Sequence, residues 1–120
     1  MTAEKPRDEI YDQLLAISRK TFREGSFEVA YHGLAAAMHR AKDKQNVPFL
    51  RELLQEAGAQ KKLLDTSHPT HPLSTSSAAS RAHESVYQAL ERNISTQLRL
   101  YDMQDLVQDH EKQQEHTTRE

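Results

Sequence analysis

The amino-acid sequence predicts an all-α protein, and three observations support this class. Apolar residues recur at spacings of three and four along several long segments, which is the periodicity of an amphipathic helix. Ala, Leu, Glu, Gln, Lys and Arg, which favour helices, dominate a chain that has only three glycines and no tryptophan. With 120 residues, the chain has the usual size of one domain. We therefore expect a single four-helix domain over residues 7–107.

The first expected helix covers residues 7–24. Gly25 tolerates the positive φ that often ends a helix, and Ser26 can cap the next one. We therefore expect a tight turn there and a second helix antiparallel to the first. Two adjoining rows of side chains run along the first helix: Ile10, Leu14, Ile17 and Thr21 in one, and Tyr11, Leu15 and Phe22 beside it.

The second expected helix, residues 26–43, has a wide apolar surface. Val29, Gly33 and Ala36 extend its apolar arc beyond a single stripe. This width predicts contact with more than one neighbouring helix, and it places the second helix at the centre of the domain. The main apolar face consists of Phe27, Ala30, Tyr31, Leu34, Ala37, Met38 and Ala41.

The third expected helix covers residues 47–65. Asn46 and Pro48 mark its start, because proline fits the first turn, where its missing N–H costs nothing. Lys61 falls on the buried face, and we expect its ammonium group to reach water. The apolar members of that face are Leu50, Leu53, Leu54, Ala57 and Leu64.

A linker over residues 66–76 separates the third helix from the last one. Its two prolines and many hydroxyl side chains favour neither helix nor strand. The last expected helix, residues 77–107, is the longest, and its end is predicted to project. We expect residues 1–6 to be flexible and residues 108–120 to form a polar, disordered tail. The apolar stripe of the last helix consists of Ala79, Ala82, Val86, Leu90, Ile94, Leu98 and Tyr101.

Residues 14–41 resemble a tetratricopeptide repeat, a two-helix unit with a glycine between the helices and small residues at their crossing. Ser18 stands at the small position of the first helix, and Gly25 stands at the turn. Thr21 departs from the family, which has an aromatic residue there, and the closing proline is missing near Lys42. The other matching positions are Leu14, Ile17, Phe27, Ala30, Leu34 and Ala37.

The resemblance implies a helical protein-interaction module, in which a hairpin precedes a third helix and a long C-terminal helix. Such repeats stack, and about three are normally needed for a stable array, whereas this chain has room for two. The linker over residues 66–76 is also longer than the turn that the family uses. A four-helix bundle whose second helix has alanines at a crossing is the alternative fold, and the sequence leaves both open.

Composition and charge exclude several classes of protein. Without cysteine, the chain can form neither a disulfide framework nor a thiolate zinc site or cysteine nucleophile. The N-terminal stretch lacks the apolar core of a signal peptide, and no apolar run approaches about 18 residues. We therefore expect a cytoplasmic protein without a membrane segment. The net charge is −2, with both signs interspersed, so no nucleic-acid partner is predicted.

Seven histidines raise the hypothesis of metal binding. His32 and His39 lie on one side of the second expected helix, with Glu28 one turn earlier. Two turns separate these imidazoles by roughly 10 Å, too far for one ion with bonds of about 2 Å. His68 and His71 lie in the linker, where no third acidic or thiol ligand completes a set. We predict no metal site and no cofactor.

No catalytic residues are predicted. The serines cluster in the linker and at helix starts, where backbone hydrogen bonding explains them, and no glycine-rich phosphate loop is present.

Basic residues gather near the ends of the second and third expected helices, where cations favour the negative end of the helix dipole. These residues are His39, Arg40, Lys42 and Lys44 on one helix, and Lys61 and Lys62 on the other.

Three functional hypotheses follow. The first is a non-catalytic interaction or scaffold module that binds a protein or peptide, either between the first two helices or on the projecting last helix. The second is a metal-binding or enzymatic four-helix bundle, which rests on the histidine count alone. The third is a homodimer through the C-terminal helix, whose apolar stripe could pair with its copy. We favour the first, although the sequence identifies no partner-binding residue.

Overall fold

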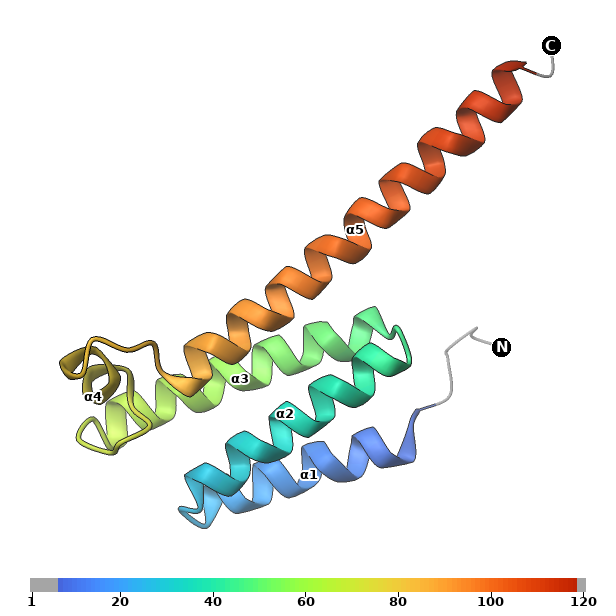
Figure 1. Ribbon diagram of the computed structural model, residues 1–120. Helices are drawn as coiled ribbons and strands as arrows, with labels where there is room; N and C mark the ends of the chain where they lie inside the picture. The colour runs from blue at the N-terminus through green and yellow to red at the C-terminus, as the bar shows by residue number, and fades with distance from the viewer. Residues whose placement is uncertain (1–6, 119–120) are drawn as a thin grey trace.

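Five helices make up the part of the chain that the structure describes. This computed structural model describes residues 7–118, and the side-chain surroundings through residue 108. No strand occurs within the described residues, so the predicted all-α class is confirmed. The expected flexible segment, residues 1–6, lies outside them. The helices are α1 (Glu9–Arg23), α2 (Phe27–Asp43), α3 (Val47–Ser67), α4 (Thr75–Ser80) and α5 (Val86–Thr118), as Figure 1 shows.

The long helices form two pairs that lie side by side (Figure 1). α1 packs along α2, and α3 packs along α5. α2 and α3 are neighbours and join the two pairs, and α2 also contacts α5. α2 therefore touches three of the other helices, as its wide apolar arc predicts. α5 packs on the bundle through its first half, and its second half projects away from it, as expected (Figure 1).

Three helix ends close with the same left-handed turn. Gly25, Gln45 and Ala82 have φ angles of 85°, 50° and 57°. At each end, the turn residue and its successor donate N–H groups to carbonyls three and five residues earlier, as Ser26 does to Thr21 at 2.8 Å. The sequence predicts such a turn at the glycine. The other two ends use residues with a Cβ, which rarely adopt this conformation.

Side-chain caps fix the starts of α1 and α3. Asp8 accepts a hydrogen bond from the Tyr11 N–H at 2.8 Å, and Asn46 accepts one from the Phe49 N–H at 3.0 Å. The predicted helix start at Asn46 is confirmed. Ser26 stands at the start of α2 but makes no side-chain cap bond there. The start of α2 therefore depends on the preceding turn.

The last expected helix, residues 77–107, is two helices in the structure. α4 ends at Ser80, and Ala82 in its left-handed conformation turns the chain before α5 begins at Val86. The prediction of one continuous helix is therefore wrong. Ala79 and Ala82 do not belong to the apolar stripe of α5, and both are exposed.

The start and the end of α5 both differ from the sequence prediction. Ser85 and Gln88 form a reciprocal cap: the Gln88 N–H donates to Ser85 Oγ at 3.1 Å, and the Ser85 N–H donates to Gln88 Oε1 at 2.9 Å. At the other end, the helix continues through Thr118, where a disordered tail over residues 108–120 is expected.

The linker between α3 and α5 is anchored by hydrogen bonds. The Asp65 carboxylate accepts from the Thr75 N–H at 2.8 Å and from its hydroxyl at 2.7 Å. The Ser74 hydroxyl donates to the Pro69 carbonyl at 2.6 Å and also caps α4. The segment between α3 and α5 therefore includes one short helix, α4, which starts at the end of the predicted linker and is tied to the end of α3.

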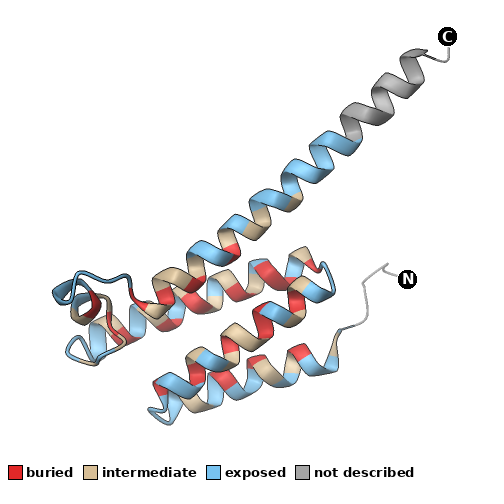
Figure 2. Ribbon diagram, viewed as in Figure 1, coloured by how far each residue is buried: buried red, intermediate tan, exposed pale blue. Residues whose placement is uncertain are grey.

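The buried core lies where α2, α3 and the first half of α5 meet (Figure 2). The predicted faces of α2 and α3 are confirmed, except that Tyr31 and Leu54 are only partly buried. Lys61 keeps its ammonium group at the edge of this core, where it pairs with Glu91 on α5. The core comprises Tyr11, Leu15, Phe27, Leu34, Ala37, Met38, Ala41, Phe49, Leu50, Leu53, Ala57, Leu64, Tyr87, Leu90 and Ile94.

The row of side chains that α1 buries is not the row in which apolar residues recur most regularly in the sequence. Tyr11, Leu15 and Ser18 are buried, whereas Ile10 and Ile17 are both 49% exposed. The reason is the close contact between α1 and α2, which turns the row with the small serine toward the other helices. Periodicity alone cannot separate two rows that lie about 100° apart on one helix.

Gly33 marks the closest approach of α1 and α2. A Cβ on Gly33 would lie 3.1 Å from Ser18 Cβ and 3.4 Å from the Leu14 carbonyl oxygen. Ala30 and Ala37, on the same helix, are fully buried. Small side chains on α2 therefore allow the two backbones to pack closely.

A chain of buried hydrogen bonds connects the four long helices. The Tyr87 hydroxyl on α5 donates to Gln60 Oε1 on α3 at 2.7 Å. Gln60 Nε2 donates to Ser18 Oγ on α1 at 3.0 Å, and Ser18 Oγ donates to the Ala30 carbonyl on α2 at 2.7 Å. Among the described residues, no buried side-chain nitrogen or oxygen lacks a partner. We call these four groups the polar chain.

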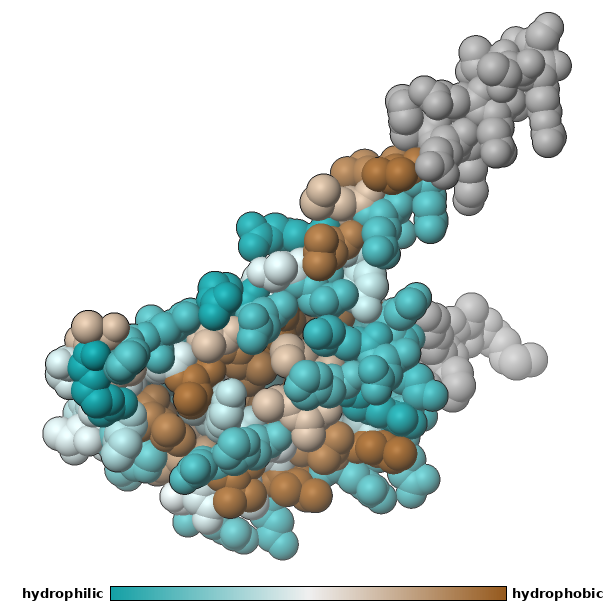
Figure 3. Space-filling model, in the orientation of Figure 1, coloured by the Kyte–Doolittle hydropathy of each residue, from teal (hydrophilic) through white to brown (hydrophobic). Residues whose placement is uncertain are grey.

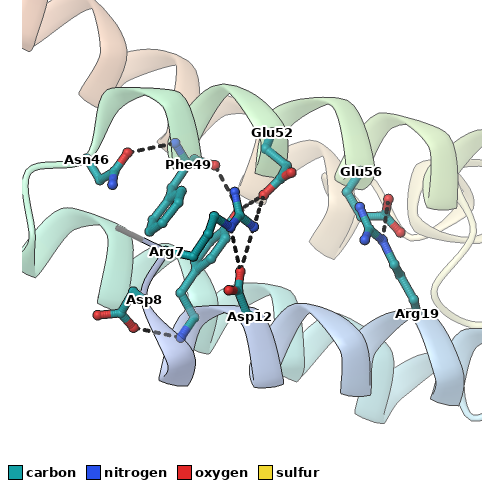
Figure 4. Close-up of polar contacts among 9 residues, drawn as sticks. Arg7, Asp8, Asp12, Arg19, Asn46, Phe49, Glu52 and Glu56 are labelled. Carbon is teal, nitrogen blue, oxygen red and sulfur yellow. Dashed lines mark hydrogen bonds and ion pairs between the residues drawn. The ribbon is translucent and has the colours of Figure 1, made fainter. Parts of the chain in front are cut away.

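α1 and α3 are joined at their other ends by an aromatic stack. The rings of Tyr11 and Phe49 lie parallel at 4.0 Å, and the Tyr11 hydroxyl donates to Glu52 Oε1 at 2.7 Å. Burial, together with the hydrogen bond to Glu52, raises the pKa of Tyr11. The Arg7 guanidinium covers the stack and reaches both Asp12 and Glu52 (Figure 4).

Replacing Ala30 with leucine tests the close packing of α2. The larger side chain has no space at a fully buried position, so we expect the free energy of unfolding to fall by about 1 to 3 kcal/mol. Urea denaturation measures this change. Ala16→Leu, on the exposed side of α1, is the matched control and should change stability by less than about 0.5 kcal/mol. An equally small effect at Ala30 would contradict the central position of α2.

Replacing Tyr87 with phenylalanine tests the polar chain. The change removes one hydroxyl and leaves Gln60 Oε1 buried without that donor, so we expect a loss of about 1 to 3 kcal/mol in unfolding free energy. Tyr101→Phe is the control, because the Tyr101 hydroxyl is only partly buried and lies 3.5 Å from its backbone acceptor. Equal losses of unfolding free energy for the two variants would argue against a special role for the polar chain.

The Asp8–Arg40 ion pair predicts a dependence of stability on acid pH. Arg40 donates to Asp8, and together with the Tyr11 N–H it holds the pKa of Asp8 below its usual value. The stabilisation is therefore complete above the unfolded pKa of about 3.9 and is lost as the pH falls through the lower folded pKa. We expect Asp8→Asn to flatten the fall in melting temperature between about pH 5 and pH 2. If the melting temperature of this variant fell with pH in parallel with that of the unaltered chain, the role assigned to Asp8 would be contradicted.

Candidate functional site

Two adjoining hollows lie on the face that α1 and α3 share, near the turn between α1 and α2. Their volumes are about 450 and 230 Å³. Phe22, Arg23 and Leu63 line both hollows, which therefore form one surface. We call this surface the α1–α3 groove. It lies at the end of the bundle opposite to the end from which α5 projects (Figure 1).

The larger hollow has an aromatic floor. The rings of Phe22 and Phe27 meet edge to face at 4.9 Å, and the His68 ring lies 5.1 Å from Phe27. Leu63 forms the opposite wall, and 55% of its surface is exposed. Gly25 also lines this hollow, and nothing lies within 4 Å of the position that a Cβ would take there. An apolar side chain of a partner would find an apolar contact surface here.

The smaller hollow is lined by an ion pair between the two helices. Arg19 on α1 lies 3.3 Å from Glu56 on α3, and Figure 4 shows the two side chains pointing toward each other. Gln60 also donates to Glu56 at 3.2 Å and lines the same hollow. The base of the groove is therefore fixed by a member of the polar chain.

The charges around the groove leave one cation and one anion without an ion pair among the residues with described side chains. Arg19 and Glu56 neutralise each other, whereas Arg23 has no ion-pair partner among the residues with described side chains. Glu24 lies beside Arg23 at the C-terminal end of α1. An anionic group that approaches Arg23 would therefore lie next to the apolar floor, a combination that suits an acidic and apolar ligand.

The histidines of the two metal hypotheses lie in different surroundings. His32 and His39 are exposed, and His32 Nε2 lies 3.9 Å from Glu28. The rings of His68 and His71 both pack against Phe27, and His71 Nδ1 accepts from the Leu73 N–H. Within the described part of the chain, no three histidine, aspartate or glutamate side chains gather as a metal would require.

Two members of the predicted basic edges are engaged in ion pairs. Arg40 donates to Asp8 at 3.0 Å across the α1–α2 pair, and Lys61 pairs with Glu91 on α5. These pairs hold helices together, which is a different structural role from the predicted interaction with the helix dipole. For Lys61 that prediction is wrong, because α3 continues to Ser67 and has no basic residue in its last turn.

The groove residues escaped prediction from the sequence because they come from three separate segments. In the sequence pattern, Phe22 is the last residue of an apolar row, and Leu63 lies one position beside the buried face of α3. The one sequence signal available was the pair Phe22 and Phe27 on either side of Gly25, since two aromatic residues beside a turn often pack together.

Among the described residues, no helix has the length and apolar composition that crossing a lipid bilayer requires. Neither a scan against protein-family models nor searches of curated proteins and of solved structures find a match for this chain.

Proposed function

We propose that this chain is a non-catalytic interaction module that holds a peptide segment of another protein in the α1–α3 groove. The observation that carries the proposal is the joining of two hollows over an aromatic floor, with Arg23 at the edge, which has no ion-pair partner among the residues with described side chains. The larger hollow, about 450 Å³, has a size typical of ligand sites.

The partner that fits this surface is a segment with a bulky apolar side chain next to a carboxylate. The apolar group would fill the space between Phe22, Phe27 and Leu63, where burial contributes about 25 cal/mol per Å². The carboxylate would accept hydrogen bonds from Arg23, whose fork geometry suits carboxylates. Glu24, which lies beside Arg23, would repel a second carboxylate on the bound segment. This repulsion would favour one orientation of the segment in the groove.

The framework around the groove favours binding, because little of it has to be ordered when a ligand arrives. The polar chain fixes Gln60 at the base, and the Arg19–Glu56 pair spans the two helices. A surface that is ordered beforehand loses less conformational entropy on association. These features support an interface, and they supply no nucleophile or metal ligand set for a reaction.

The resemblance to a tetratricopeptide repeat over residues 14–41 supports the same proposal and stays a prediction. Two features agree with it: the left-handed turn at Gly25, and the contact of Ser18 with α2 at the crossing. Repeats of this family present extended surfaces to their partners. The enzymatic or metal-binding alternative has no comparable observation in the described residues.

A library of displayed random peptides, selected on the intact chain, tests this proposal. We expect the enriched peptides to combine a bulky apolar residue with Asp or Glu. Fluorescence anisotropy of the best peptide should then show affinity reduced about tenfold or more by Leu63→Glu and by Arg23→Glu, a change of at least about 1.4 kcal/mol.

Ile10→Glu is the matched control, because Ile10 is exposed to a similar extent on α1 but lies outside the groove. It should leave the affinity unchanged. Enriched peptides that bind the Leu63→Glu chain as tightly as the unaltered chain would refute the groove as the site.

A further inference from the structure

Two histidine rings contact the aromatic floor of the α1–α3 groove. The centroid of the Phe27 ring lies 5.1 Å from that of His68 and 5.2 Å from that of His71. His68 is exposed and lines the larger hollow together with Arg23, whereas His71 is half-buried. His68 can therefore contact a segment bound in the groove, and His71 supports the floor.

The groove differs in chemistry from the exposed apolar surface of α5. Figure 3 shows hydrophobic side chains on the projecting part of that helix. The exposed residues there carry side chains that do not titrate, namely Leu100, Met103, Leu106 and Val107. The groove instead places charged and titratable side chains beside its apolar floor. Its affinity for a charged segment can therefore depend on pH.

The two imidazoles differ in their hydrogen bonds. His71 Nδ1 accepts from the Leu73 N–H at 3.1 Å, so protonation of this nitrogen would break the bond. The His68 imidazole forms no hydrogen bond or ion pair within the described residues. Its backbone is held in place, because its N–H donates to the Leu64 carbonyl at 2.7 Å and its carbonyl accepts from the His71 N–H at 3.0 Å. His68 therefore offers its ring nitrogens to a ligand from an ordered backbone position.

The charge of the larger hollow depends on the protonation of His68. Arg23 and Glu24, at the end of α1, line the same hollow. They carry opposite charges, so protonation of His68 would change the combined charge of the three side chains from neutral to positive. The hollow would then attract an anionic group more strongly than a neutral one.

We propose that His68 acts with Arg23 in recognising the carboxylate of the bound segment, so that the groove binds an acidic segment more tightly as the pH falls. This proposal rests on the peptide-binding function proposed for the groove. Histidine changes its charge between about pH 5 and pH 8, and the protonated ring donates from both nitrogens. A bound carboxylate favours the charged ring, and by linkage the charged ring binds the carboxylate more tightly.

Other titratable groups on the elements around this histidine have different roles. On α3, the Asp65 carboxylate accepts two hydrogen bonds from Thr75. On α2, Glu28 lies 3.9 Å from His32 Nε2. Protonation of His71 would break its bond beside the floor of the groove and would weaken binding. The direction of the pH dependence therefore separates an effect at the hollow from an effect at the floor.

NMR titrations of the full chain with 3-phenylpropionate test this proposal. The probe joins an apolar ring to a carboxylate that stays ionised between about pH 8 and pH 6, and 3-phenylpropionamide is its uncharged match. The methyl signals of Leu63 report binding in the groove, whereas those of Leu100 on α5 should not shift. We expect the dissociation constant of 3-phenylpropionate to fall about two- to fivefold over this pH range, as an exposed ion pair would produce. The dissociation constant of 3-phenylpropionamide should stay unchanged.

His68→Gln tests the role of the imidazole itself. Glutamine keeps polar hydrogen-bonding groups but does not titrate. The variant should therefore bind 3-phenylpropionate like the unaltered chain at the higher pH and lose the gain in affinity at the lower pH. His32→Gln is the control, because His32 is exposed on α2 and does not line the groove, and it should keep the gain. Circular dichroism should show unchanged helix content in both variants, because both positions are exposed.

The outcomes distinguish this proposal from the function on which it rests. Suppose that the Leu63 signals shift, but the dissociation constant is constant with pH, rises at the lower pH, or falls equally in His68→Gln. The role of His68 is then overturned, and the groove remains a binding site. If neither probe shifts the Leu63 signals at either pH, the proposed function and the role of His68 are both overturned.

Discussion

The arrangement of this protein depends on the polar chain, in which each of the four long helices supplies one hydrogen-bonding group. Apolar side chains tolerate several packing arrangements of similar free energy, whereas a buried polar group without a partner costs about 1 to 3 kcal/mol. In this placement of the helices, Tyr87, Gln60, Ser18 and the Ala30 carbonyl satisfy each other. The polar chain therefore favours this register between the α1–α2 pair and the α3–α5 pair.

That register also shapes the surface. Gln60 belongs to the polar chain and lines the smaller hollow, so the interior hydrogen bonds and the groove share a residue. Gly33 lets α1 approach α2 closely, and this contact turns Ser18 inward and leaves Ile17 half-exposed. Ser18 and Gly33 therefore determine which side of α1 faces inward. The large residues Tyr11 and Leu15 are buried because they lie on that side.

The sequence predicted the all-α class, the hairpin at Gly25 and the buried face of α2, because these follow from local periodicity and one glycine. It did not predict the break before α5, because alanine at position 82 is a good helix former that here adopts a left-handed conformation. The spacing of Ser85 and Gln88 was the available signal, since it fits a capping box. The groove could not be predicted, because its walls come from segments about 40 residues apart that only the register brings together.

The groove and the exposed apolar residues Leu100, Met103 and Val107 of α5 lie at opposite ends of the molecule (Figure 1). A peptide held in the groove would therefore leave these three side chains uncovered. Binding at one of the two surfaces places no steric restriction on the other.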